Sequence, residues 1–138
     1  MWAREVSLET TASPAAIWRL WSNVDGWPEW NGDIEHIEID GEFATGSRIS
    51  MTPIGQEAVE LSIVEVVENE LFVDEVDLGD ALIRTVHRLD RCGEDRMRVI
   101  YRMQITGTAA DELGPQLGPK ITADFPQTLA ALVQRAQR

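Results

Sequence analysis

Four tryptophans close together constrain the fold of this chain more than any other feature of its sequence. Trp18, Trp21, Trp27 and Trp30 all fall within the segment SPAAIWRLWSNVDGWPEWN. Tryptophan combines the largest apolar surface of any side chain with one N–H donor. A segment so rich in indole rings is expected to close a large apolar interior, and therefore to pack on the core of a globular domain.

The same segment predicts two short helices. Ser13 followed by Pro14 is an N-cap with proline at the first helical position. The apolar residues that follow repeat at helical spacing and predict one buried face, made of Ile17, Leu20, Trp21 and Val24. Trp27 and Trp30 are three residues apart, so they share one side of a second, single-turn helix.

Apolar and polar residues alternate on both sides of this segment, which predicts β-strands. One strand, residues 2–10, precedes the helices. Six strands follow, separated by turns at 40–41, 53–55, 68–69, 79–80 and 92–95. The apolar parity changes near Val64, which indicates a β-bulge or a strong bend.

Helical spacing returns over residues 111–138. The apolar stripe comprises Leu113, Leu117, Ile121, Phe125, Leu129, Leu132 and Ala136. Pro115, Pro119 and Pro126 interrupt it, so we expect a bent or stepped helix that is regular from about residue 122. A seven-stranded curved antiparallel sheet wrapped on one long helix is an α+β design, and the space between them predicts an internal cavity.

Composition bounds the chain to a single domain, residues 1–138, without a signal peptide or a run long enough to cross a membrane. The net charge of −12 argues against binding to nucleic acid or insertion into anionic membranes. The single cysteine, Cys92, excludes an internal disulfide and is typical of the reducing cytoplasm. We expect a cytoplasmic monomer or homodimer.

Metal and cofactor binding are not predicted. The two histidines, His36 and His87, belong to no cluster of metal-ligating residues, and no glycine-rich phosphate-binding loop is present.

Several segments together resemble the SRPBCC superfamily, the helix-grip proteins related to START domains and the birch-pollen allergen, and in particular its polyketide cyclase/dehydrase branch. The matching segments are Ser13-Pro14 with Ile17-Trp18, Asp25 to Trp30, Thr85 to Leu89, and Ala123 to Leu132. The resemblance spans nearly the whole chain. It implies a deep pocket between the sheet, the tryptophan helices and the C-terminal helix, which in this superfamily holds lipids, sterols, hormones or polyketides.

His87 and Tyr101 are the candidate catalytic residues. Strand parity places both on the inner face of two strands joined by a hairpin, so they are expected to lie near each other. Histidine and tyrosine suit the acid–base chemistry of a cyclase or dehydratase. The favoured interpretation is a hydrogen-bonded core histidine beside a tyrosine at the pocket rim, followed by contacts that orient a ligand, and catalysis is the third.

The predicted ligand-binding residues line this pocket from the tryptophan helices, the inner strand faces and the last helix. They are Trp18, Trp27, Trp30, Met51, Leu61, Thr85, His87, Tyr101, Met103, Ile121 and Phe125.

The strand at residues 71–78 has two competing alternations, so Asp74 or Asp77 can face inward. A carboxylate there needs a partner, most simply Arg84 on the next strand. A solvated outer face is the favoured interpretation.

Three functions fit these features. The preferred one is binding or carriage of a small hydrophobic molecule, aromatic or polyketide-like, in the cavity. The second is a polyketide cyclase, aromatase or dehydratase that uses His87 and Tyr101. The third is a protein-interaction module of the chaperone-activator type, which predicts a filled core and an exposed apolar patch.

Overall fold

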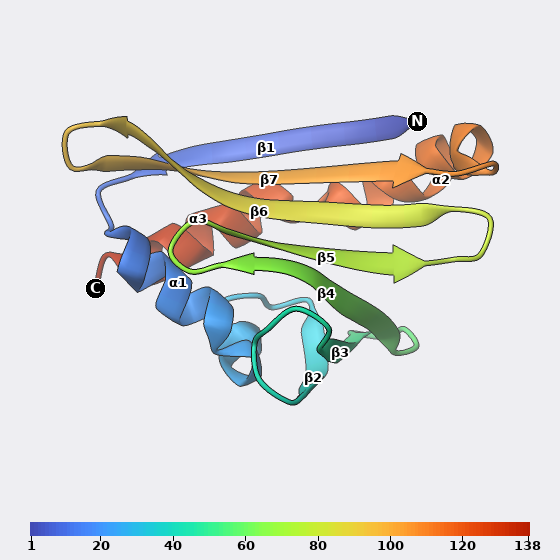
Figure 1. Cartoon of the computed structure of the whole chain (residues 1–138), viewed down its shortest axis with the longest axis horizontal. Helices are drawn as coiled ribbons and strands as arrows, with labels where there is room; N and C mark the ends of the chain where they lie inside the picture. Colours follow the sequence, from blue (N-terminus) through green and yellow to red (C-terminus); the bar gives the residue numbers. More distant parts are fainter.

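The computed structural model describes residues 1–138 as one antiparallel sheet with two helical segments after the first strand and two helices at the C-terminus (Figure 1). The elements are β1 (Trp2–Thr10), α1 (Pro14–Ser22), the 3₁₀ helix η1 (Val24–Glu29), β2 (Ile34–Asp40), β3 (Arg48–Pro53), β4 (Val59–Val67), β5 (Leu71–Asp77), β6 (Leu82–Gly93), β7 (Arg96–Thr106), α2 (Ala110–Thr122) and α3 (Phe125–Ala136). This is the predicted α+β helix-grip arrangement.

The seven strands lie in the order β1-β7-β6-β5-β4-β3-β2, so every chain-consecutive pair from β2 to β7 is a neighbour. The first strand forms one edge of the sheet and pairs with the last strand, with Val6 opposite Tyr101. The register of β4 against β5 shifts between Ile63 and Glu65. The predicted bulge is therefore confirmed.

Local signals explain the first helix. The Ser13 hydroxyl accepts a hydrogen bond from the backbone N–H of Ala16 at 3.1 Å, which satisfies one of the free donors at the helix start. Pro14 opens the helix, where its missing N–H costs no hydrogen bond. Ile17 and Trp21 are fully buried, as the helical spacing predicts.

The C-terminal helix is stepped as predicted, but the step lies elsewhere than the prolines of α2 suggest. Pro115 and Pro119 remain inside α2. The helix is interrupted at Ala123 and Asp124, just before Pro126. Both internal prolines are on the exposed side of α2, where water can bond the carbonyls that lose their N–H partners.

The fully buried positions of α2 are held by small residues, Ala110, Gly114, Gly118 and Thr122. Leu113 and Leu117 of the predicted stripe are half-buried and pack beside them on the core. A Cβ on Gly114 or Gly118 would come within 2.4 or 2.5 Å of the Trp2 side chain, so the indole lies directly on the glycine backbone. The step also separates the faces of α2 and α3. As a result Ile121, predicted to line the pocket, is 40% exposed.

The core lies between the concave face of the sheet and the helices that cross it (Figure 1). One cluster of 20 buried residues joins α1, η1 and α3 to the sheet, and a smaller cluster of five, including Met103 and Ile105, lies under α2. No helix is long and apolar enough to span a membrane.

Candidate functional site

Three neighbouring strands place an aromatic and polar cluster on the concave face. The register sets Phe72 of β5 opposite His87 of β6, and His87 opposite Tyr101 of β7. The imidazole stacks on the Phe72 ring with centroids 3.9 Å apart, and it meets the Tyr101 ring edge-on at 4.7 Å. The predicted proximity of His87 and Tyr101 is therefore present.

The backbone of β5 selects the tautomer of His87. Its Nδ1 lies 3.3 Å from the carbonyl oxygen of Phe72 and must donate to it, which leaves Nε2 as an acceptor. Burial disfavours the imidazolium and lowers the pKa of His87 to about 3, against the smaller opposing effect of this hydrogen bond. His87 is therefore neutral at physiological pH.

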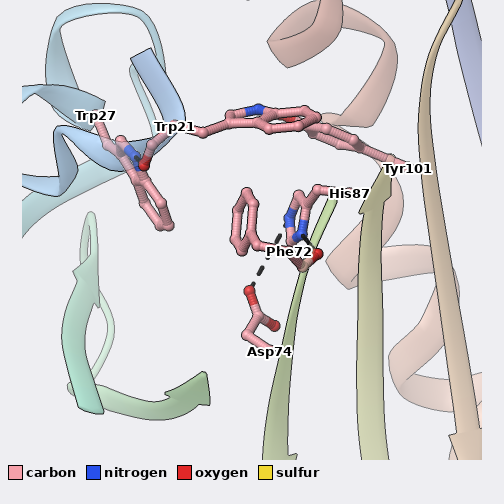
Figure 2. A network of polar contacts seen from close by, with 6 residues as sticks. All are labelled: Trp21, Trp27, Phe72, Asp74, His87 and Tyr101. Atoms are coloured by element: carbon pink, nitrogen blue, oxygen red, sulfur yellow. Dashed lines mark hydrogen bonds and ion pairs between the residues drawn. The ribbon is translucent and has the colours of Figure 1, made fainter. Parts of the chain in front are cut away.

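Tyr101 is held from the side of the tryptophan helices. The indole N–H of Trp21 donates to the Tyr101 hydroxyl at 3.1 Å, and the indole N–H of Trp27 donates to the Trp21 carbonyl at 3.0 Å. Burial raises the pKa of Tyr101, so its hydroxyl stays protonated. Figure 2 shows Trp21 and Tyr101 on one side of the Phe72–His87 stack and Asp74 on the other.

Asp74 is a largely buried carboxyl group that makes no hydrogen bond within the chain, and its oxygens are not completely shielded from solvent. Its side chain is 9% exposed, and its nearest polar contact is Nε2 of His87 at 3.9 Å, which is beyond hydrogen-bond distance. Burial, followed by the charge of Glu75, raises the pKa of Asp74 to about 7. Because His87 is neutral, the pair is not an ion pair despite the short separation.

The position of Asp74 corrects the sequence-based expectation of a solvated outer face. Asp74 faces inward, while Arg84, its expected partner, lies on the outer face and contacts Glu75 at 2.9 Å. The alternation of apolar and polar residues along β5 is ambiguous because both faces of this strand carry a buried apolar residue. Val73, on the outer face, is 2% exposed and therefore about as well buried as Phe72 on the inner face.

The centre of the expected cavity is filled by aromatic side chains. Phe43, from the loop between β2 and β3, packs edge-on against Trp18 and Phe72, with centroids 5.7 and 5.0 Å apart. Two hollows of about 400 and 420 Å³ lie elsewhere, one at the β5–β6 turn beside Gly107 and the other on β2–β4 around Arg48. Neither includes a residue of the aromatic cluster.

The concave face is less closed on the Asp74 side of the stack. The register places Asp74 between Ile63 of β4 and Thr85 of β6. Apolar and hydroxyl side chains on this part of the face, and on the facing helix step, are only half-buried. They are Met51, Val59, Val76, Thr85 and Phe125. We call this set the half-open surface, and Asp74 lies at its buried end.

The predicted ligand residues divide between this surface and the core. Met51, Thr85 and Phe125 belong to the half-open surface. Trp18, Trp27, Trp30 and Leu61 are in the large core cluster, and Met103 is fully buried under α2. Ile121 is exposed, as described above. Contact of any of them with a ligand remains a prediction.

Sequence reasoning did not single out Asp74, Phe72 or Phe43 as site residues. A signal for the first two exists, since Phe72, Asp74 and Val76 are spaced two apart and match the inward parity of His87 on the neighbouring strand. Phe43 lies in a loop, where alternation carries no information.

A second acidic group lies at the helix step. Burial and the neighbouring Asp33 side chain raise the pKa of Asp124, which also accepts a hydrogen bond from the Thr128 hydroxyl at 3.4 Å. No group of three or more His, Cys, Asp or Glu side chains is arranged to hold a metal ion.

No protein-family model and no curated protein matches the sequence. Solved structures do match over almost the whole chain. A START superfamily protein from Mycobacterium smegmatis is 16% identical, with 98% of this chain and 97% of that chain covered and a TM-score of 0.75.

Two enzymes are similar to the same extent. Norcoclaurine synthase from Thalictrum flavum, in complex with dopamine and hydroxybenzaldehyde, is 16% identical over 96% of this chain and 84% of that chain, with a TM-score of 0.75. The di-domain ARO/CYC StfQ from the steffimycin biosynthetic pathway is 14% identical, with 98% of this chain and 50% of that chain covered and a TM-score of 0.77. These likenesses show the helix-grip fold.

Proposed function

We propose that this helix-grip chain binds a small hydrophobic molecule of aromatic or polyketide-like character on the half-open surface, with a polar group of that molecule at Asp74. The observation that carries the proposal is the buried Asp74 carboxyl, which makes no hydrogen bond within the chain. No fully buried side-chain nitrogen or oxygen of the chain lacks a hydrogen-bond partner, so the Asp74 oxygens keep some accessible surface. A bound molecule with a hydrogen-bond donor would find in Asp74 an acceptor that no group of the chain uses.

The surroundings of Asp74 favour an apolar body for the ligand. Met51, Val59, Val76 and Phe125 offer apolar contacts that are incompletely covered by the chain itself. Binding sites for small molecules are typically apolar walls with few polar groups that fix orientation. Two proteins of the same fold support an aromatic ligand by analogy. They are the norcoclaurine synthase in complex with dopamine and hydroxybenzaldehyde, and StfQ from the steffimycin biosynthetic pathway.

Native mass spectrometry of the purified protein tests this proposal. We expect a fraction of the protein to retain a small molecule that is released on denaturation. The variant Val76→Trp fills the half-open surface and should abolish retention. Ile54→Trp is the matched control, because Ile54 is 61% exposed and outside that surface. The proposal fails if the protein carries no small molecule and binds none of a set of hydrophobic aromatic probes.

Acid–base catalysis is the second candidate, and it centres on Asp74 instead of His87 and Tyr101. A pKa of about 7 lets Asp74 give or take a proton at physiological pH. Tyr101 hydrogen-bonds to Trp21, and the His87 ring is covered by Phe72. If a cyclase or dehydratase substrate is found, turnover should be lost in Asp74→Asn and survive in Tyr101→Phe. Loss of turnover in Tyr101→Phe with retention in Asp74→Asn would instead favour His87 and Tyr101 as the catalytic residues.

The protein-interaction alternative has weaker support. The filled centre agrees with it, but the exposed large hydrophobic residues come from separate segments of the chain: Met1, Leu8, Ile54, Leu78 and Ile121. Failure of ligand retention in the experiment above would favour this alternative.

A further inference from the structure

We propose that the half-open surface selects ligands that carry a protonated amine on their apolar body, and that Asp74 is the carboxylate that pairs with this amine. The inference rests on the proposed function and specifies its ligand class. It follows from the charges and the hydrogen-bonding groups that surround Asp74.

The charged groups between the sheet and the helices favour a cation. Asp74 is unpaired, and Asp124 adds a second carboxyl group at the helix step. The basic side chain on the same side, Arg4, is already used, because it donates to the carbonyl and hydroxyl of Thr122 at 3.2 Å. A carboxylate ligand would therefore meet negative charge without a free base, whereas an ammonium ligand is complementary.

The hydrogen-bonding groups around Asp74 are acceptors. The carboxylate itself accepts, and Nε2 of His87 is an acceptor because Nδ1 donates to the Phe72 carbonyl. The Thr85 hydroxyl, directly opposite Asp74 in the register, can accept as well. An alkylammonium group has three N–H donors and no acceptor, so it matches this set.

Binding of an amine should depend on pH through Asp74. The titratable groups that face this carboxyl are His87 from β6 and Tyr101 from β7, while Glu75 acts from its own strand and Asp124 from the helix step acts on Tyr101. His87 is neutral and Tyr101 is protonated throughout the neutral range. With a pKa of about 7, Asp74 becomes the carboxylate as the pH rises from 6 to 8, so amine affinity should rise about tenfold across that interval.

Three probes with one aromatic body test the inference: 2-(1-naphthyl)ethylamine, 2-(1-naphthyl)ethanol and 1-naphthylacetate. The same head groups on a phenyl body serve for a smaller site. Isothermal titration calorimetry at pH 6 and pH 8 measures each affinity. We expect the amine to bind tightest at pH 8, the alcohol to show no pH dependence, and the acetate to bind weakest.

The variant Asp74→Asn keeps the shape of the side chain and removes its charge. It should weaken amine binding by about 30-fold or more and change alcohol binding by less than about threefold. Asp77→Asn is the matched control, because it removes the same charge from an exposed position of β5 and should change neither affinity. The pH dependence of the wild-type protein is an independent measurement that needs no variant.

The possible failures are distinct. If the alcohol binds as tightly as the amine at pH 8, or if Asp74→Asn retains the preference for the amine, the inference is wrong and the proposed function stands. If no probe of either size binds, the inference is wrong, and if the purified protein also carries no small molecule, the proposed function fails as well.

Discussion

The ring of His87 lies flat on the ring of Phe72, with centroids 3.9 Å and planes 3° apart, while its Nδ1 donates to the carbonyl of that same residue. One cross-strand neighbour therefore sets both the orientation and the tautomer of the histidine. The remaining nitrogen, Nε2, points toward Asp74 (Figure 2). The acceptor that a ligand would meet beside Asp74 is thus a consequence of the β5–β6 register.

His87 should remain neutral in the folded protein down to about pH 4. Burial opposes the imidazolium, and the hydrogen bond to Phe72 holds the Nδ1–H tautomer. Two-bond ¹H–¹⁵N correlation spectra of the imidazoles measure both properties, with His36→Gln identifying the signals of the other histidine. An imidazolium at pH 6 would instead indicate an ion pair with Asp74.

Asp74→Asn should gain stability relative to the wild-type protein as pH rises. The folded-state pKa of Asp74, about 7, is above its ordinary value of 3.8, so its contribution to stability is fully present below pH 3.8 and is lost as pH approaches 7. Between pH 5 and pH 8 the difference in unfolding free energy should move by about 2–3 kcal/mol in favour of the variant. Urea unfolding at both pH values measures it.

The acid side of the same experiment isolates His87. Its folded-state pKa is lowered to about 3 from 6.5, so its contribution is present above pH 6.5 and is lost as pH falls toward 3. In the wild-type protein the slopes of Asp74 and His87 oppose each other between about pH 4 and pH 6.5. Asp74→Asn should therefore become more acid-sensitive in this range. An unchanged slope would contradict the raised pKa of Asp74, and a variant whose stability does not fall between pH 6.5 and pH 4 would contradict the lowered pKa of His87.

Tyr101→Phe should destabilise the fold although it deletes only one oxygen. The hydroxyl accepts the indole N–H of Trp21, a fully buried residue, and its loss leaves that donor unpaired. A buried unsatisfied donor costs about 1–3 kcal/mol. Denaturant unfolding checks the loss. A change below about 0.5 kcal/mol would mean that another group satisfies Trp21.

Gly118→Ala should also be destabilising, by about 1–3 kcal/mol from overpacking against Trp2. The added Cβ would lie 2.5 Å from the indole ring, whereas alanine in an open helix position normally stabilises by up to about 1 kcal/mol. Gly32→Ala is the control, because nothing lies within 4 Å of its Cβ position. In thermal unfolding, the midpoint temperature of Gly118→Ala should fall strongly, whereas that of Gly32→Ala should change little. Equal stability of both would place Trp2 away from α2.

The fold was predictable because one face of nearly every strand is buried, which leaves a regular alternation in the sequence. Ser13, Pro14 and the spacing of Ile17 and Trp21 predicted the first helix for similarly local reasons. The approach of His87 to Tyr101 also followed from parity and the length of one hairpin.

The site was less predictable because it depends on contacts between distant segments. The inward position of Asp74 is concealed by Val73, whose burial on the outer face matches that of Phe72. The exposure of Ile121 results from the helix step and from the packing of Gly114 and Gly118 on Trp2. Trp2 precedes these two glycines by 112 and 116 residues in the chain. The alternation of strand residues and the spacing of helix residues therefore predict neither the inward position of Asp74 nor the exposure of Ile121.

The most direct test of the central claim is an NMR titration of the ¹⁵N-labelled protein with 2-(1-naphthyl)ethylamine at pH 8. We expect shift changes to concentrate on Asp74, Thr85 and Val76 of the inner strand faces and on Phe125 at the helix step, and to weaken at pH 6. Changes confined to the hollow at Gly107 or to the outer hollow at Arg48, with Asp74 unaffected, would contradict the account.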